Sequence, residues 1–184
     1  LWLARRKDVP AIAKEEAGVS REFWMFIGAL VLFFSAVLIT GATSLPVWNK
    51  IVQAFNPEYV GAALKDPVAH HNRYQLWIAV FIGLLSGVAQ WMRYGERNWE
   101  AWGKKFIRHM IIAAVAAGVL TALNALWLNI HAWQFFAMLF AGMFTLAANV
   151  DYIITFLKGN LKQAASALSH IGFGILVLGI LGTG

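Results

Sequence analysis

The sequence predicts an all-α integral membrane protein with five transmembrane helices. Its 184 residues are 60% hydrophobic and only 13% charged, with a mean hydropathy of +0.63, whereas soluble chains average about 45–50% apolar and about 25% charged residues. The apolar residues gather in five runs of about 19–25 residues, each long enough for a helix to cross a hydrocarbon core of about 30 Å. These runs do not alternate between polar and apolar residues, as the strands of a membrane β-barrel do.

The boundaries of the spans follow from the connections between them. The first run closes at Pro46, and only four residues, 129–132, separate the third run from the fourth, which predicts a tight antiparallel hairpin. Because lipid offers the backbone no hydrogen bonds, we expect every run to be helical. The predicted spans are residues 23–45, 74–92, 110–128, 133–157 and 164–182.

Two of the connections have an amphipathic composition. Within the long connection 46–73, the stretch WNKIVQAF predicts a helix on the membrane surface, because four apolar side chains share one face: Trp48, Ile51, Val52 and Phe55. Between the second and third spans, basic residues alternate with Trp99 and Trp102, and we expect this stretch at the interface with anionic lipid.

The distribution of basic residues predicts the orientation of the chain. Of the 15 lysines and arginines, twelve lie before the first span, between the second and third, or after the fourth, and three lie in the connection 46–73. Basic residues concentrate on the cytoplasmic side of membrane proteins, so we expect a cytoplasmic N-terminus and a C-terminus on the outer side. The same asymmetry accounts for the net charge of +6 without a nucleic-acid partner.

The ends and the composition of the chain limit its chemistry. It begins LWLARRKDVP and ends within an apolar run, without a signal-peptide pattern. We therefore expect residues 1–184 to form a single transmembrane helical segment of a larger protein. The sequence has no cysteine, which excludes thiol, disulfide and covalent thioether sites on this chain.

The strongest candidate site is His170, an ionisable residue near the start of the fifth span. Ser166 and Gly174 share its helix face, and Ser166 is placed to fix one ring nitrogen while the other binds a metal. The glycine-rich composition of this span has two explanations. Small residues permit close helix packing, or they leave room for a flat cofactor such as haem at an intramembrane histidine.

Other polar residues also permit two interpretations. His109 starts the third span on the same membrane side as His170, so it is either an interfacial residue or a second haem ligand. Asp151 lies well inside the fourth span. It is either a partner for a neighbouring group or part of a proton relay. In the outer connections, His70 and His71 are either a solvated turn or contacts for a haem propionate, and His131 is expected to be structural.

Two stretches resemble the CcmF family, the haem lyases of bacterial cytochrome c maturation. The first is SREFWMFIGALVLFFSAVLITGATSLPVW with the Asn-Arg-aromatic entry into the second span, and the second is ALSHIGFGILVLGILG in the fifth span. The resemblance covers nearly the whole chain. The residues of the first stretch and of the helix entry that carry it are Ser20, Arg21, Glu22, Gly41, Pro46, Asn72, Arg73 and Tyr74.

The resemblance implies a function and a set of partners. Members of this family lie in the bacterial inner membrane, with the outer side in the periplasm, receive haem from the chaperone CcmE, and attach it to apocytochrome c together with the thiol partner CcmH. They also hold a b-type haem, and the resemblance makes His170 one axial ligand of its iron. The other ligand and the tryptophan-rich WWD segment fall outside this sequence, so the segment alone is not expected to be an active lyase.

Two other functions remain open at this point. A haem-b electron-transfer subunit would use His109 and His170 within one chain, and a non-enzymatic transporter or assembly segment would use Asp151. For the lyase, residues 47–73 are the candidate surface for partners.

Overall fold

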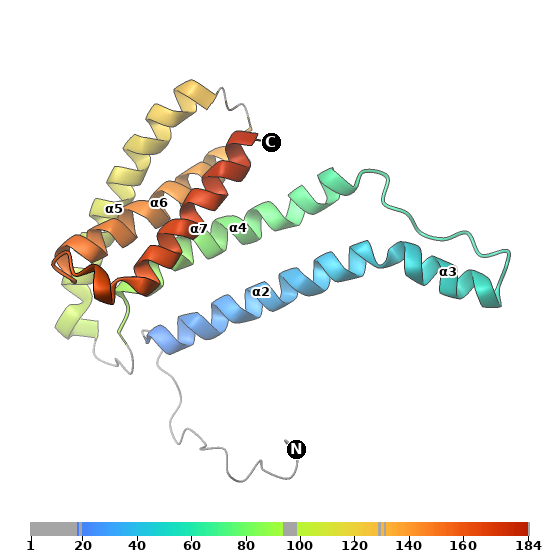
Figure 1. The fold of residues 1–184 in the computed structure, drawn as a ribbon, viewed down its shortest axis with the longest axis horizontal. Helices are drawn as coiled ribbons and strands as arrows, with labels where there is room; N and C mark the ends of the chain where they lie inside the picture. The colour runs from blue at the N-terminus through green and yellow to red at the C-terminus, as the bar shows by residue number, and fades with distance from the viewer. Residues whose placement is uncertain (1–17, 19, 94–98, 129, 131, 184) are drawn as a thin grey trace, which may run out of the picture.

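The computed structural model describes residues 18, 20–93, 99–128, 130 and 132–183, and this part of the chain is helical without strands. Five of the helices are long and apolar enough to cross a membrane, which confirms the predicted fold class. The elements in chain order are α2 (Arg21–Thr43), α3 (Leu45–Phe55), α4 (Pro67–Trp91), α5 (Trp99–Leu128), α6 (Trp133–Thr155), the 3₁₀ helix η1 (Leu161–Gln163) and α7 (Ala165–Thr183) (Figure 1).

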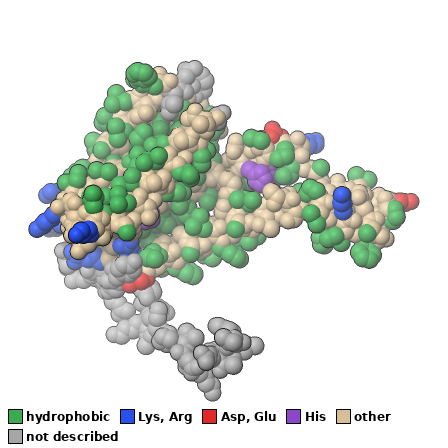
Figure 2. Space-filling view, viewed as in Figure 1, with side chains coloured by type: hydrophobic (Ala, Val, Ile, Leu, Met, Phe, Trp, Pro, Cys, Tyr) green, Lys and Arg blue, Asp and Glu red, His purple; other side chains and the backbone are tan. Residues whose placement is uncertain are grey.

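Helix α6 lies at the centre of the bundle and packs against α4, α5 and α7, whereas α2 packs on α4 (Figure 1). Successive spans run in opposite directions, so α2, α5 and α7 begin at the end of the bundle where α4 and α6 finish. Figure 2 shows lysine and arginine side chains gathered there, and we call it the basic end. The opposite end, which carries α3, is the outer end.

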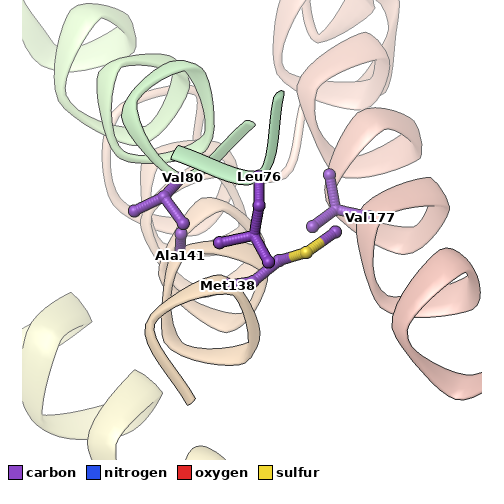
Figure 3. Packing of buried hydrophobic residues seen from close by; sticks show 5 residues of the cluster. All are labelled: Leu76, Val80, Met138, Ala141 and Val177. Carbon is purple, nitrogen blue, oxygen red and sulfur yellow. The ribbon is translucent and has the colours of Figure 1, made fainter. Parts of the chain in front are cut away.

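The helices pack through small and branched apolar side chains. One buried cluster joins α4, α6 and α7 through Leu76, Val80, Met138, Ala141 and Val177 (Figure 3). Close approach of α4 and α6 depends on glycine, since a Cβ at Gly83 would lie 3.3 Å from the Ala141 methyl group. Such contacts matter in lipid, where helices associate by van der Waals packing and hydrogen bonds instead of water exclusion.

Helix α2 has a more limited contact with the bundle. Gly28 lets α2 approach Leu85 of α4, and the Ser35 hydroxyl donates to Gln75 Oε1 at 2.5 Å. Most other apolar side chains of α2 are exposed, and Figure 2 shows comparable apolar surface over the other helices on this face. A lipid bilayer is the environment that this surface fits.

Two helices begin earlier than the sequence predicted. Helix α4 starts at Pro67, not Tyr74, because Asp66 caps it by accepting a hydrogen bond from the Ala69 backbone N–H at 2.9 Å. Helix α5 starts at Trp99, not at residue 110. In both cases the first turns are polar and project beyond the apolar run, which is why hydropathy did not detect them.

The helix predicted over WNKIVQAF is confirmed as α3, and its place on the membrane surface stays a prediction. Pro46 lies in its first turn, so this proline begins α3 after α2 has ended at Thr43. Three of the four apolar residues on its predicted face, Trp48, Ile51 and Phe55, are exposed. Trp102 differs from the expectation of an interfacial anchor, because it is buried and packs edge-on against Phe106.

Candidate functional site

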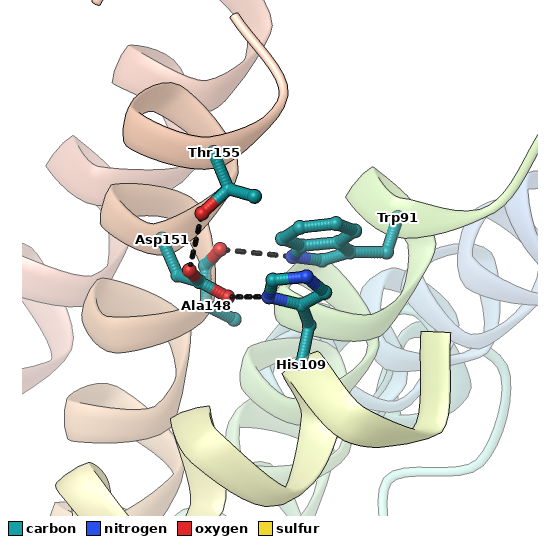
Figure 4. Close-up of polar contacts among 5 residues, drawn as sticks. All are labelled: Trp91, His109, Ala148, Asp151 and Thr155. Carbon is teal, nitrogen blue, oxygen red and sulfur yellow. Dashed lines mark hydrogen bonds and ion pairs between the residues drawn. The ribbon is translucent and has the colours of Figure 1, made fainter. Parts of the chain in front are cut away.

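Three helices bring a histidine, an aspartate and a tryptophan together near the basic end. His109 comes from α5, Asp151 from the last turns of α6, and Trp91 is the final residue of α4 (Figure 4). His109 Nδ1 lies 2.7 Å from Asp151 Oδ2, and only 3% of the His109 surface is exposed, against 19% for Asp151. A short contact between two ionisable side chains at this depth identifies the cluster as a candidate site.

The surrounding contacts hold this pair in one orientation. Trp91 stacks on the His109 ring, with centroids 4.3 Å apart and planes 14° from parallel, and its Nε1–H donates to the Ala148 carbonyl oxygen at 3.1 Å. Thr155 donates to the other carboxylate oxygen of Asp151 at 2.9 Å. Both oxygens of Asp151 are therefore engaged, and the imidazole can neither rotate nor tilt without breaking a contact.

The arrangement distinguishes the two ring nitrogens of His109. With Nδ1–H donated to the carboxylate, Nε2 is the nitrogen that makes no contact with Asp151. Beside the cluster lies a cavity of about 30 Å³, lined by Trp91, Arg93, Trp102, Lys105, Phe106 and Phe156. This volume accommodates water but is far too small for an organic substrate or a porphyrin.

A second polar cluster joins the starts of α2 and α7 to the end of α4. Ser166 donates to Gln90 Oε1 at 3.0 Å, and one guanidinium nitrogen of Arg21 donates to Gln90 Oε1 at 3.3 Å and to Ser166 at 3.4 Å. The Arg21 backbone N–H also bonds to the Arg93 carbonyl at 3.0 Å. These contacts fix the position at which α7 enters the bundle.

His170 is half-buried, one turn after Ser166 on α7. The expected hydrogen bond between these two side chains was wrong, because Ser166 instead bonds to Gln90 and Arg21. Within the described residues no hydrogen bond involves the His170 ring. The ring nitrogens of His170 thus remain available, unlike Nδ1 of His109.

The sequence allowed two explanations for the glycines of α7, close helix packing and room for a flat cofactor, and the structure distinguishes one glycine from the other three. Gly174 is buried, and a Cβ there would lie 3.1 Å from Leu146 Cδ2 and 3.2 Å from the Gly142 carbonyl oxygen, so it serves close packing of α7 on α6. The other three, Gly172, Gly179 and Gly182, have no atom within 4 Å of such a Cβ. They leave parts of α7 without side-chain cover, which packing within this chain does not require.

The pairing of His109 with Asp151 was not predicted, although a signal for it exists in the sequence. In an antiparallel hairpin, residues equally far from the turn lie at the same depth. His109 precedes Asn129 by 20 residues, and Asp151 follows Ala132 by 19. Treating the two residues as separate candidates missed this match.

At the outer end, His70 and His71 lie in the first turns of α4 instead of a loop, with ring centroids 5.5 Å apart. His131 falls outside the described residues. Near His70 and His71 is an open groove of about 370 Å³, lined by Ala69, Asn72, Arg73, Leu76, Trp77, Trp133, Gln134 and Phe135.

Comparisons with known proteins do not assign the chain to a family. No family model matches it, and neither a curated protein nor a solved structure shows significant similarity to it. In the part of the chain that the structure describes, no three His, Asp or Glu side chains gather closely enough to hold a metal ion by themselves.

Proposed function

We propose that this chain is part of a CcmF-like haem lyase of the bacterial inner membrane, with its N-terminus in the cytoplasm. The single observation that carries the proposal is His170, a half-buried histidine near the start of a membrane span whose ring has no hydrogen bond from the described residues. This histidine lies in the stretch that resembles the family. An intramembrane histidine without a hydrogen-bond partner is costly unless it binds something.

His170 is the residue that would hold the iron of a b-type haem, because its ring makes no hydrogen bond within the described residues. Histidine is the usual protein ligand of such haems, and burial together with neighbouring polar groups would set the potential of the iron. His109 is a poor second ligand, since it is bonded to Asp151 beside a cavity of only about 30 Å³. We therefore favour a second ligand outside this sequence, as the resemblance implies, over the electron-transfer alternative that joins His109 and His170.

The chain's own contribution to the mechanism is positioning. Arg21, Gln90 and Ser166 lock the starts of α2 and α7 to the end of α4, and this fixes the depth and rotation of the turn that carries His170. The resident haem, when bound, would supply one-electron redox chemistry, whereas the vinyl groups that form the thioethers belong to the substrate haem. His170 would hold the iron, and the surrounding apolar helices would exclude water from it.

The outer end is the surface that we assign to partners. It carries the exposed side chains Trp48, Ile51 and Phe55 of α3 and the groove beside Arg73. CcmE, a CcmH-type protein and apocytochrome c would all meet the lyase on this side. Deleting α3 or reversing the charge of Arg73 is expected to impair cytochrome c maturation, and unchanged maturation would remove this assignment.

The decisive experiment is a reduced-minus-oxidised visible spectrum of the detergent-purified parent protein. The wild-type spectrum is expected to show b-type bands, and His170→Ala is expected to lose them because the iron loses an axial ligand. Glu58→Ala, at an exposed position of the outer end, is the control and should keep them. A wild-type protein without b-type bands, or bands that persist in His170→Ala, would contradict the haem assignment.

A further inference from the structure

The cluster of Trp91, His109 and Asp151 has no role in the proposed lyase, yet it is the most constrained polar arrangement among the described residues. We propose that it is a redox-linked proton site: His109 takes up a proton from the basic side of the membrane when the cofactor held by His170 gains an electron. This inference rests on the proposed function for the cofactor, and on the geometry of the cluster for the proton.

The charges balance in this step. While His109 Nδ1–H donates to Asp151, the pair carries a net charge of −1, and a proton bound at Nε2 brings it to 0. A haem held by His170 would supply one-electron chemistry, and its reduction by an external one-electron reductant would add one negative charge beside His170. Uptake of one proton from water cancels that added charge, which matters most in a region of low dielectric constant.

Other charged and titratable side chains lie near the pair. Within the described residues these are Arg93, two residues after the end of α4, Lys105 and Arg108 on α5, and Tyr152 on α6, which meets Trp91 edge-on. Histidine is the side-chain type that ordinarily gains or loses a proton near neutral pH. The aspartate next to it fixes which nitrogen does so.

The water-sized cavity of the candidate site lies on the same side. It has a volume of about 30 Å³ and is bounded by the exposed residues Arg93 and Lys105 at the basic end. His109 does not line this cavity itself, but the Trp91 ring that stacks on His109 does. We therefore assign the entry of the proton to the basic end, from which the remaining length of the bundle separates the outer end.

The cluster is connected to His170 through the last two residues of α4. Trp91 stacks on His109, and its neighbour Gln90 accepts a hydrogen bond from Ser166, one turn before His170. The end of α4 thus contacts His109 on one side and the turn before His170 on the other. A charge in this region of packed helices is screened less than a charge in water.

The test is a spectroelectrochemical titration of the haem in the purified parent protein at a series of pH values. The wild-type midpoint potential is expected to fall as the pH rises, because reduction takes up a proton. Asp151→Asn and His109→Gln are each expected to flatten this dependence, and either variant suffices if the other fails to fold. Glu58→Gln, at an exposed position of the outer end, is the matched control and should keep the wild-type slope.

The outcomes separate this inference from the proposed function. A b-type haem whose potential does not depend on pH, or keeps its pH dependence in both Asp151→Asn and His109→Gln, overturns the proton site and leaves the lyase proposal standing. A parent protein without haem overturns both. Flattening in the cluster variants alone supports the proton site.

Discussion

His109 shows how one buried side chain can connect three helices. Its backbone belongs to α5, its Nδ1 reaches Asp151 of α6, and its ring face lies on Trp91 of α4. A polar group in the interior of a membrane protein that loses its partner has no water to replace it. The pair therefore contributes to the stability of the bundle whatever its chemical role.

The value of this pair can be measured by substitution at Asp151. Asp151→Ala leaves the His109 Nδ1–H buried without an acceptor and is expected to destabilise the protein by about 1–3 kcal/mol. Thr155→Val removes only a supporting hydrogen bond and should cost about 0.6 kcal/mol, the average for such bonds between membrane helices. Reversible unfolding in mixed detergent micelles would give both values, and equal effects of the two substitutions would contradict a special role for Asp151.

At the scale of elements, α7 presents glycine to two different environments. Gly174 touches α6, with the Gly142 carbonyl oxygen 3.2 Å from the position of a Cβ, whereas a Cβ at Gly179 would meet no atom within 4 Å. The contact of α6 with α7 is among the most extensive in the bundle. The first glycine therefore sets a helix-to-helix distance, and the second does not.

Alanine at these two positions separates the roles. Gly174→Ala forces Leu146 or the α6 backbone to move and is expected to destabilise the protein by about 1–3 kcal/mol, the usual range for overpacking. Gly179→Ala should be neutral or slightly stabilising, because alanine favours the helix and meets no atom. The same unfolding assay measures both variants. A neutral Gly174→Ala would show that α7 does not depend on this close approach.

The start of α4 gives a prediction of the same kind. Asp66 caps this helix through the Ala69 N–H, so Asp66→Ala should lower stability by about 1 kcal/mol, whereas Asp66→Asn, also a good capping residue, should cost less. Circular dichroism during unfolding reports the loss. If alanine and asparagine behaved alike, the cap would not stabilise α4.

The five spans could be predicted from hydropathy, because a helix that crosses lipid must be apolar along its length. The hairpin of α5 and α6 could be predicted because only a short connection separates Leu128 from Trp133. The polar first turns of α4 and α5 could not be predicted from hydropathy, since their stability depends on capping and on contacts outside the apolar runs. The Ser166–His170 bond was predicted from helix spacing alone. In the structure Ser166 instead bonds to Arg21 of α2 and Gln90 of α4, and residue spacing within α7 cannot reveal contacts with other helices.

At the scale of the whole molecule, the basic end unites features that are distant in the sequence. The cluster of His109 and Asp151, the contacts of Arg21, and His170 all lie towards the end at which α2, α5 and α7 begin. In the proposed redox-linked step, His109 would take up its proton from the compartment that faces this end. Which compartment this is depends on the orientation of the chain.

Cysteine labelling of intact cells tests the orientation, and the natural absence of cysteine makes each introduced thiol unique in this chain. The distribution of basic residues predicts that Lys162 near the start of α7 faces the cytoplasm, and the proposed function then predicts that Glu58 after α3 faces the periplasm. A maleimide that does not cross the inner membrane should label Glu58→Cys in intact cells and Lys162→Cys only after the membrane is permeabilised. Both positions are exposed, so access within the protein does not limit the reaction. The reverse pattern would invert the topology, and the proton taken up by His109 would then come from the periplasm.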